Sequence, residues 1–503
     1  MEFPSPSTTT FLPDLLYAGG RFLRGRALVC DGAGRVVRVA RVEELGEGVE
    51  AVSLRGRAML PGMVNAHSHA FQRVIRGRTE YRGASTSAGA RDSFWTWRGQ
   101  MYAAASRLTP EDIYDASRMA FLEMALSGIT TVGEFHYLHR TPEGAEYEDP
   151  NLLSKQVVRA ARDVGISIAL LRVAYARAGF MKEPDPRQLR FIEPDAETFL
   201  RHTEALVGGL ARSESNTEAG DGGGAARRAW AGVAPHSVRA VTVEHLRHLR
   251  DFADARSLPV HMHVAEQPAE VEACLAETGR TPVALLADEG LLGPRFTGVH
   301  AVHVTAEEVA RLRDSRACVC ACPTTERNLG DGVVPADLLF GQGVAVALGT
   351  DSHAQIDLLE DARELEYHLR LKRLERNVLA PGASEDESGS DSNVDSDKDA
   401  ARASSLAARL FECATSAGAR SVGANAGEFA EGKSADFFTV DLEDPSVAGA
   451  SAEDLLPAVV FSLSRAAVRE TAAAGRLIVE GSRHAAQDEI VSRFRALQKK
   501  LWR

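Results

Sequence analysis

The sequence has little cysteine, no long apolar run and no excess of basic residues. Only six of its 503 residues are cysteine, and they are spread too unevenly for a disulfide framework, which predicts a reducing compartment. No window approaches 18 uninterrupted apolar residues, and the first residues, with Glu2 and Asp14, lack the basic and apolar regions of a signal peptide. We therefore expect a cytoplasmic protein without a membrane partner.

The charge of the chain is uneven. The formal net charge is −12, and about half of it comes from residues 384–399, which hold seven acidic residues and one lysine. The rest of the chain shows no basic stripe, so no nucleic-acid partner is expected, because phosphate backbones bind clustered lysine and arginine. A small-molecule substrate fits this composition better.

Short β-branched runs alternate with stretches of helical period between residues 108 and 417. Eight strands are expected, at 58–65, 130–136, 166–173, 230–235, 259–264, 297–303, 317–322 and 344–351. Helices are expected between them, for example at 110–126, 151–164, 243–255, 268–278 and 306–314, with Thr109 and Thr305 as N-caps. This number of βα units predicts an α/β fold, a (β/α)8 TIM-like barrel, more than an open doubly wound sheet.

The two chain ends have a different pattern. Residues 15–42 and 434–481 consist of short alternating runs broken by glycine and aspartate, which predicts one small β-sandwich domain formed from both chain ends. We divide the chain into 1–57 and 426–503, the two parts of the sandwich with a terminal helix, and 58–425, the barrel. Within the barrel, 213–226 and 382–403 hold too little apolar surface to offset the entropy of ordering and are expected to be disordered insertions.

Chemistry-bearing side chains follow several of the expected strands. His67 and His69 end the first strand, and on a strand their i, i+2 spacing puts both side chains on one face. Such a pair is weak evidence alone, because the chain has 15 histidines and structural histidines are commoner than ligands. His263, His300 and Asp351 also stand at strand ends, and all strand ends of a barrel meet at one face. This coincidence favours an active site over separate structural roles, such as core histidines or helix caps.

Three imidazoles and one carboxylate can hold one divalent metal ion per subunit and leave a position open for water. The expected ligands are His67, His69, His263 and Asp351. Such an ion lowers the pKa of its water from ~15.7 toward ~7. Glu266, three residues after His263, is placed to move the proton of this water to a leaving nitrogen. His300 is left to polarise the substrate, so the expected catalytic residues are Glu266, His300 and Asp351.

A second metal site is less favoured. Cys318, Cys320 and Cys322 share one face of an expected strand. Buried small side chains explain this pattern at least as well as ligands do.

Together these motifs resemble the amidohydrolase superfamily. The motifs are residues 61–69 (PGMVNAHSH), His263-x-x-Glu266, His300 and residues 349–353 (GTDSH), and they span nearly the whole chain. The mononuclear deaminase branch of the superfamily lacks a bridging carboxylated lysine. No lysine stands near an expected strand end here, which is consistent with that branch.

Five further strings resemble the formiminoglutamate deiminases. They are residues 69–73 (HAFQR), 92–98 (DSFWTWR), 134–137 (EFHY), 234–239 (APHSVR) and 325–332 (TERNLGDG). The resemblance implies hydrolysis of N-formimino-L-glutamate to N-formyl-L-glutamate and ammonia in histidine degradation, with zinc as the metal and a homodimer as the assembly. It also implies four substrate contacts, which are Gln72, Tyr137, His236 and Arg239. Trp95 and Trp97 are interpreted as loop packing.

Two alternatives stay open. The same metal site could deaminate a purine or pyrimidine ring, which would not need Arg239, whereas a substrate with carboxylates needs a cationic fork of this kind. The chain could also be a non-catalytic amidohydrolase-like scaffold, but such proteins typically lack ligands, and all of the expected ligands are present.

Overall fold

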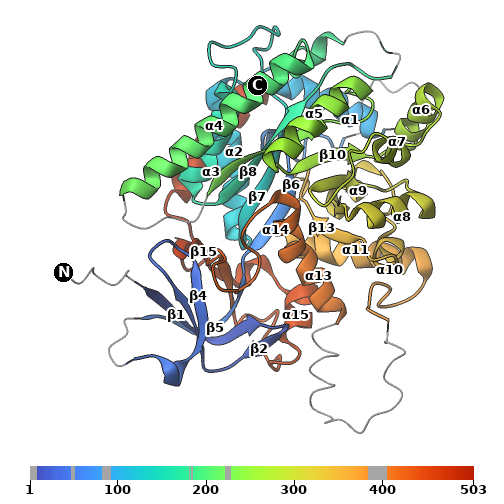
Figure 1. The fold of residues 1–503 in the computed structure, drawn as a ribbon. Coiled ribbons are helices and arrows are strands. Elements are labelled where there is room, and N and C mark those ends of the chain that lie inside the picture. The colour runs from blue at the N-terminus through green and yellow to red at the C-terminus, as the bar shows by residue number, and fades with distance from the viewer. Residues whose placement is uncertain are drawn as a thin grey trace.

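The computed structural model describes residues 8–46, 51–81, 92–180, 182, 185–220, 228–382 and 405–502. These residues form a parallel sheet and a separate mixed sheet (Figure 1). No helix in this part of the chain is long and apolar enough to cross a membrane.

The parallel sheet is an eight-stranded barrel. Its strands follow chain order and are β6 (Met63–Ser68), β7 (Ile129–His136), β8 (Ser167–Ala174), β9 (Ala229–Pro235), β10 (Val260–Val264), β11 (Phe296–His300), β12 (Cys318–Ala321) and β13 (Ala345–Leu348). The two end strands meet through one parallel bridge, between Ser68 and Asp351. The predicted (β/α)8 barrel is confirmed.

The first expected strand, 58–65, is divided between the two sheets. β5 (Ala51–Pro61) belongs to the mixed sheet, and β6 begins at Met63. The chain changes sheet at Gly62, where an added Cβ would lie 2.4 Å from Thr130 Oγ1. Only glycine allows this close approach, so the apolar run continues in sequence while the hydrogen-bond partners change.

Helices surround the barrel (Figure 1). In chain order they are α1 (Phe94–Ala105), α2 (Pro110–Leu126), α3 (Leu152–Val164), α4 (Ala196–Gly220), α5 (Val243–Arg256), α6 (Pro268–Thr278), α7 (Pro282–Asp288), α8 (Ala306–Ser315), α9 (Pro323–Leu329), α10 (Ala336–Gly341), α11 (Leu358–Arg373), α13 (Leu406–Ala414), α14 (Ser416–Val422), α15 (Leu455–Ser462) and α16 (Gln487–Trp502). Thr109 and Thr305 cap α2 and α8 as predicted, because each side chain accepts a hydrogen bond from the backbone N–H three residues on.

The segments expected to be disordered are only partly described. Helix α4 continues to Gly220, so the first part of 213–226 is helical, which differs from the expectation. Extending an existing helix costs little per residue, and a composition poor in apolar side chains does not prevent it. Residues 221–226 and 383–403 lie outside the described residues.

Helix α14 covers the end of the barrel where the strands begin. Gly418 packs against the backbone of Val64, and the indole N–H of Trp230 donates to the Val422 carbonyl at 2.7 Å. His261 Nε2 contacts the Ser421 carbonyl at 2.8 Å. These contacts close one end of the barrel, so the expected site residues lie toward the opposite end.

The mixed sheet combines both chain ends, as predicted (Figure 1). Its strand order is β16-β15-β14-β5-β1-β3-β4, with β2 paired to β1. The remaining bounds are β1 (Thr9–Ala18), β2 (Arg21–Leu23), β3 (Arg26–Cys30), β4 (Val36–Arg41), β14 (Phe437–Asp441), β15 (Val468–Ala473) and β16 (Arg476–Val479). β5 is parallel to β1 and antiparallel to β14, so it joins the two ends. The domain boundaries at 57 and 425 stay predictions.

Candidate active site

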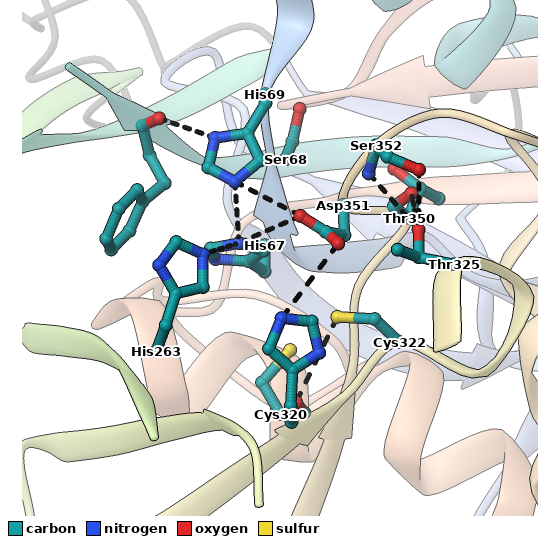
Figure 2. A network of polar contacts seen from close by, with 12 residues as sticks. His67, Ser68, His69, His263, Cys320, Cys322, Thr325, Thr350, Asp351 and Ser352 are labelled. Carbon is teal, nitrogen blue, oxygen red and sulfur yellow. Dashed lines mark hydrogen bonds and ion pairs between the residues drawn. The ribbon is translucent and has the colours of Figure 1, made fainter. Parts of the chain in front are cut away.

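The four expected metal ligands converge on one point. His67 Nε2 lies 3.2 Å from Nε2 of His69 and 3.2 Å from Nε2 of His263. Asp351 Oδ1 lies 3.3 Å from His67 Nε2 and 3.1 Å from His69 Nε2. All four side chains are buried, and their ligand atoms lie within 4.8 Å of one another. Figure 2 shows the three imidazoles directed at the carboxylate.

The hydrogen bonds on the outer side of the cluster favour a cation at its centre. His69 Nδ1 lies 2.9 Å from the Phe135 carbonyl, and His263 Nδ1 lies 3.0 Å from the His236 carbonyl. A carbonyl only accepts, so both protons belong on Nδ1 and both Nε2 lone pairs point inward. Lone pairs that face one another beside a carboxylate repel unless a cation lies between them. The donor set therefore fits a divalent metal ion.

The charges of the cluster also suit a metal. Burial lowers the pKa of His67 to about 3 and that of His263 well below its usual value. Burial alone would raise the pKa of Asp351, but its close contacts with His67 and His69 hold it well below its usual value. Neutral imidazoles and an ionised carboxylate are the forms in which these residues bind metals.

The turn after β13 holds Asp351 in an unusual backbone conformation. Its φ is +43°, in the left-handed region, which costs about 1–3 kcal/mol for a residue other than glycine. Two backbone hydrogen bonds hold it there, from Asp351 N–H to the His67 carbonyl (3.0 Å) and from His69 N–H to the Asp351 carbonyl (3.1 Å). The end of β6 and the turn after β13 therefore hold each other in place.

Glu266 and His300 lie beside the cluster. His300 Nε2 is 3.6 Å from Glu266 Oε1 and 4.0 Å from Asp351 Oδ2, so the three expected catalytic residues face one space. On its other side, His300 Nδ1 is 3.2 Å from Glu326 Oε1. Burial alone would lower the pKa of His300, but the nearby carboxylates raise it well above its usual value. Glu326 was missed in the sequence, although it lies within the string TERNLGDG.

A cavity next to the cluster is lined by all four expected substrate contacts. Gln72 Nε2 donates to the Tyr137 hydroxyl at 2.9 Å, and the His236 ring packs on that of Tyr175 with 4.6 Å between centroids. Arg239 is buried, and among the described residues nothing accepts from its Nε or Nη1. The lining residues are His69, Gln72, Phe94, Trp97, Arg98, Met101, Tyr102, Tyr137, Tyr175, His236, Arg239, His263, Glu266, Leu329 and Asp351.

Helix α1 contributes a wall of this cavity that sequence reasoning missed. Its lining positions are Phe94, Trp97, Arg98, Met101 and Tyr102. Their spacing of three, one, three and one is a helical period, and this was the signal available in the sequence. The interpretation of Trp97 as loop packing is therefore wrong. Arg98 Nε donates to the Tyr102 hydroxyl and brings a second guanidinium to the cavity.

The three spaced cysteines are buried in the barrel interior, in a cluster with Trp230. Cys322 lies near His300 and Glu326, and this group could geometrically hold an ion. However, burial raises the pKa of the Cys322 thiol well above its usual value, and thiols bind metals as thiolates. Glu326 Oε1 already accepts from the Cys322 N–H at 2.8 Å. We therefore interpret the group as hydrogen-bonded support for His300.

Comparison with known proteins agrees with this geometry. A model of the amidohydrolase family matches residues 58–478. The chain belongs to the amidohydrolase family. This amidohydrolase is 35% identical to a formimidoylglutamate deiminase of Pseudomonas aeruginosa over 479 residues, which cover 93% of this chain and 96% of that protein.

Two further proteins show how far the similarity extends. A 5-methylthioadenosine/S-adenosylhomocysteine deaminase of Halobacterium salinarum is 28% identical, over 96% of this chain and 97% of that protein. The crystal structure of an amidohydrolase from Brucella melitensis superposes with a TM-score of 0.83 at 31% identity, covering 98% of this chain and 100% of that one. Together with the ligand cluster, these relatives support a metal-dependent hydrolase of the deaminating type.

Proposed function

We propose that this amidohydrolase is a deiminase that hydrolyses N-formimino-L-glutamate to N-formyl-L-glutamate and ammonia, a step of histidine degradation. The observation that carries the proposal is a pair of arginines, Arg98 and Arg239, in the cavity beside the metal cluster. A substrate with two carboxylates needs two cationic partners, and arginine binds a carboxylate through two parallel N–H donors. The 35% identical relative named formimidoylglutamate deiminase supports the same substrate.

The proposed cofactor is one zinc ion per subunit, held by His67, His69, His263 and Asp351. Three imidazoles and one carboxylate suit zinc and leave a position open. When bound, the ion would supply water acidic enough to ionise near neutral pH.

Glu266 and His300 have separate roles in the proposed reaction. Glu266 accepts one proton from the attacking water and gives it to the imino nitrogen, which leaves a hydroxyl and an amino group on the tetrahedral carbon. Glu266 then carries the hydroxyl proton to the amino group, so that the C–N bond breaks, ammonia leaves and the carbon keeps the oxygen as a formyl group. Nδ1 of His300 faces Glu326, so Nε2 is left to donate a hydrogen bond to the oxygen or nitrogen on the reacting carbon. Asp351 and His300 together stabilise the tetrahedral carbon.

The remaining contacts orient the substrate. Arg239 lines the cavity, and its Nε and Nη1 have no acceptor among the described residues, so its guanidinium is available as the fork for one carboxylate. Arg98 on α1 takes the other, with Gln72, Tyr137 and His236 between them as further contacts. Two guanidinium groups in one cavity suit a linear substrate with two carboxylates better than a neutral ring.

A substrate comparison with the purified full-length protein tests the proposal. We expect ammonia release from formiminoglutamate, and a much lower kcat/KM for formiminoglycine, which lacks the second carboxylate. Turnover of S-adenosylhomocysteine or 8-oxoguanine, without turnover of formiminoglutamate, would establish the ring deaminase instead. Absence of both bound metal and turnover would establish the scaffold.

The cytoplasmic location and the homodimer stay predictions. All six cysteines of the chain are buried and free, which supports a reducing compartment.

A further inference from the structure

We propose that Ser68, Glu134 and His353 form a positioning network that fixes the metal ligands at the seam of the barrel, which is the junction where its first strand, β6, meets its last strand, β13. Ser68 lies between the ligands His67 and His69, and His353 follows Asp351 by two residues. The inference rests on the proposed metal centre, but none of the three side chains belongs to the ligand set.

The network joins three barrel elements through short contacts. Ser68 Oγ donates to Glu134 Oε2 at 2.6 Å, and Glu134 Oε1 accepts the Ala70 N–H at 2.7 Å. Glu134 on β7 therefore binds the residues on both sides of His69. His353 Nε2 lies 3.0 Å from Ser68 Oγ. All three side chains are almost fully buried, so water does not compete for these bonds.

The direction of the bonds is set by their partners. The Ser68 hydroxyl has one proton, and it goes to the carboxylate of Glu134. Its oxygen is then free to accept, so His353 donates from Nε2. A single chain of donation runs from His353 through Ser68 to Glu134. Removing either end leaves a buried polar group without a partner and loosens the turn that carries His69.

The seam needs such support because its backbone pairing is sparse. Most neighbouring strands of the described barrel form longer ladders, for example five pairs between β10 and β11, although β9 and β10 share one pair and an isolated bridge. Between β6 and β13 the structure has an isolated bridge, Ser68 with Asp351. Side chains add to it, since Asn65 and Thr350 exchange two hydrogen bonds of 2.7 and 3.0 Å. Three of the four expected ligands, His67, His69 and Asp351, therefore lie where side-chain hydrogen bonds supplement a short backbone pairing.

His353, the first donor of the network, is held in place by Arg76. The His353 carbonyl accepts from Arg76 Nε at 2.5 Å, and Arg76 Nη1 donates to Glu123 at 2.6 Å. His353 adopts a φ of +60°. An anchored histidine in a strained conformation is suited to hold a neighbouring ligand in place, because it has little freedom to move.

The test measures metal affinity in Glu134→Gln and Ser68→Ala. We expect zinc to bind roughly 10- to 100-fold more weakly, by competition with a chromogenic chelator, as is typical when a residue that orients ligands is lost. The cobalt-substituted variants should show altered d–d absorption, because the ligand geometry changes. Ser68→Thr keeps the hydroxyl and should restore both readouts.

A matched control separates positioning from general stability. Glu366 is an equally buried carboxylate on α11 that accepts the N–H groups of Val378 and Leu379 and pairs with Arg370. Glu366→Gln should lower the melting temperature and leave metal affinity unchanged. If Glu134→Gln and Ser68→Ala bind zinc and absorb as the unaltered protein does, the network has no positioning role. If the unaltered protein binds no metal, the proposed function fails first.

Discussion

Replacement of Arg239 by methionine tests the proposed substrate most directly. The methionine side chain keeps much of the apolar volume and removes the guanidinium. Arg239 is 8% exposed, and in the described part of the chain its Nε and Nη1 have no acceptor, so either of them can join Nη2 in presenting two parallel N–H donors to one carboxylate. Its nearest carboxylate, Glu266, is 3.9 Å from Nη2, which is too far for a hydrogen bond.

The expected loss follows from the two donors. A hydrogen bond to a charged group contributes about 1.5–3 kcal/mol, so two contribute roughly 3–6 kcal/mol. At 1.4 kcal/mol per factor of ten, kcat/KM for formiminoglutamate should fall by roughly 10²- to 10⁴-fold. The carboxylate is bound before and during the reaction, so most of the loss should lie in KM.

The assay is the initial rate of ammonia release with a coupled enzyme, at zinc contents checked by elemental analysis. Arg239→Lys keeps the charge without the fork and should lose less than Arg239→Met. Arg247→Met is the control, because Arg247 is exposed and pairs with Glu289 at the surface. An unchanged kcat/KM in Arg239→Met, with zinc bound, would refute the carboxylate fork and favour a ring substrate.

Four further outcomes are expected. Glu266→Gln should keep its zinc and lose roughly 10²- to 10⁴-fold in kcat, and a normal kcat would exclude Glu266 as the proton carrier. Gly349→Ala should lose metal and melt at a lower temperature, because the new Cβ would lie 2.7 Å from the Cβ of His67; full metal loading would contradict this. Arg172→Met removes the 2.5 Å partner of the buried Glu193, which keeps its ion pair with His202 Nδ1 at 2.6 Å, and should cost about 3–5 kcal/mol of unfolding free energy in urea. A loss below about 1 kcal/mol would place the pair among the weak ones. A chelator should abolish turnover and lower the melting temperature, and zinc should restore both, because ligand binding stabilises the folded state.

The sequence predicted those parts of the fold and site that depend on local patterns. β7 and β8 are buried along their whole length, and their β-branched and apolar residues were visible as short runs in the sequence. His67 and His69 stand two residues apart, and this spacing places them on one face without knowledge of the rest of the fold. The start of helix α2 is also marked in the local sequence by its N-cap, Thr109, and the apolar period that follows indicates the helix itself.

The parts that were missed depend on distant partners. The apolar run through Gly62 gives no sign that its backbone hydrogen bonds change from the mixed sheet to the barrel. The close approach that requires glycine there is made to Thr130, which is distant in sequence. Glu134 is separated from Ser68 by 66 residues, and their hydrogen bond has no signal in either local sequence. Glu326 likewise supports His300 across 26 residues. Local propensity does not report such pairings.

The mixed sheet has a consequence for how the protein is made. β5 lies between β1 and β14 in the mixed sheet and has buried leucine, alanine and methionine side chains. β14 begins at Phe437, 376 residues after β5 ends at Pro61. A ribosome therefore releases β5 long before its antiparallel neighbour exists, with one edge unpaired while the whole barrel emerges. An unpaired edge is an aggregation hazard. Newly synthesised chains should depend on chaperones until the last strands appear, and fragments that end before β14 should precipitate even though they hold every metal ligand.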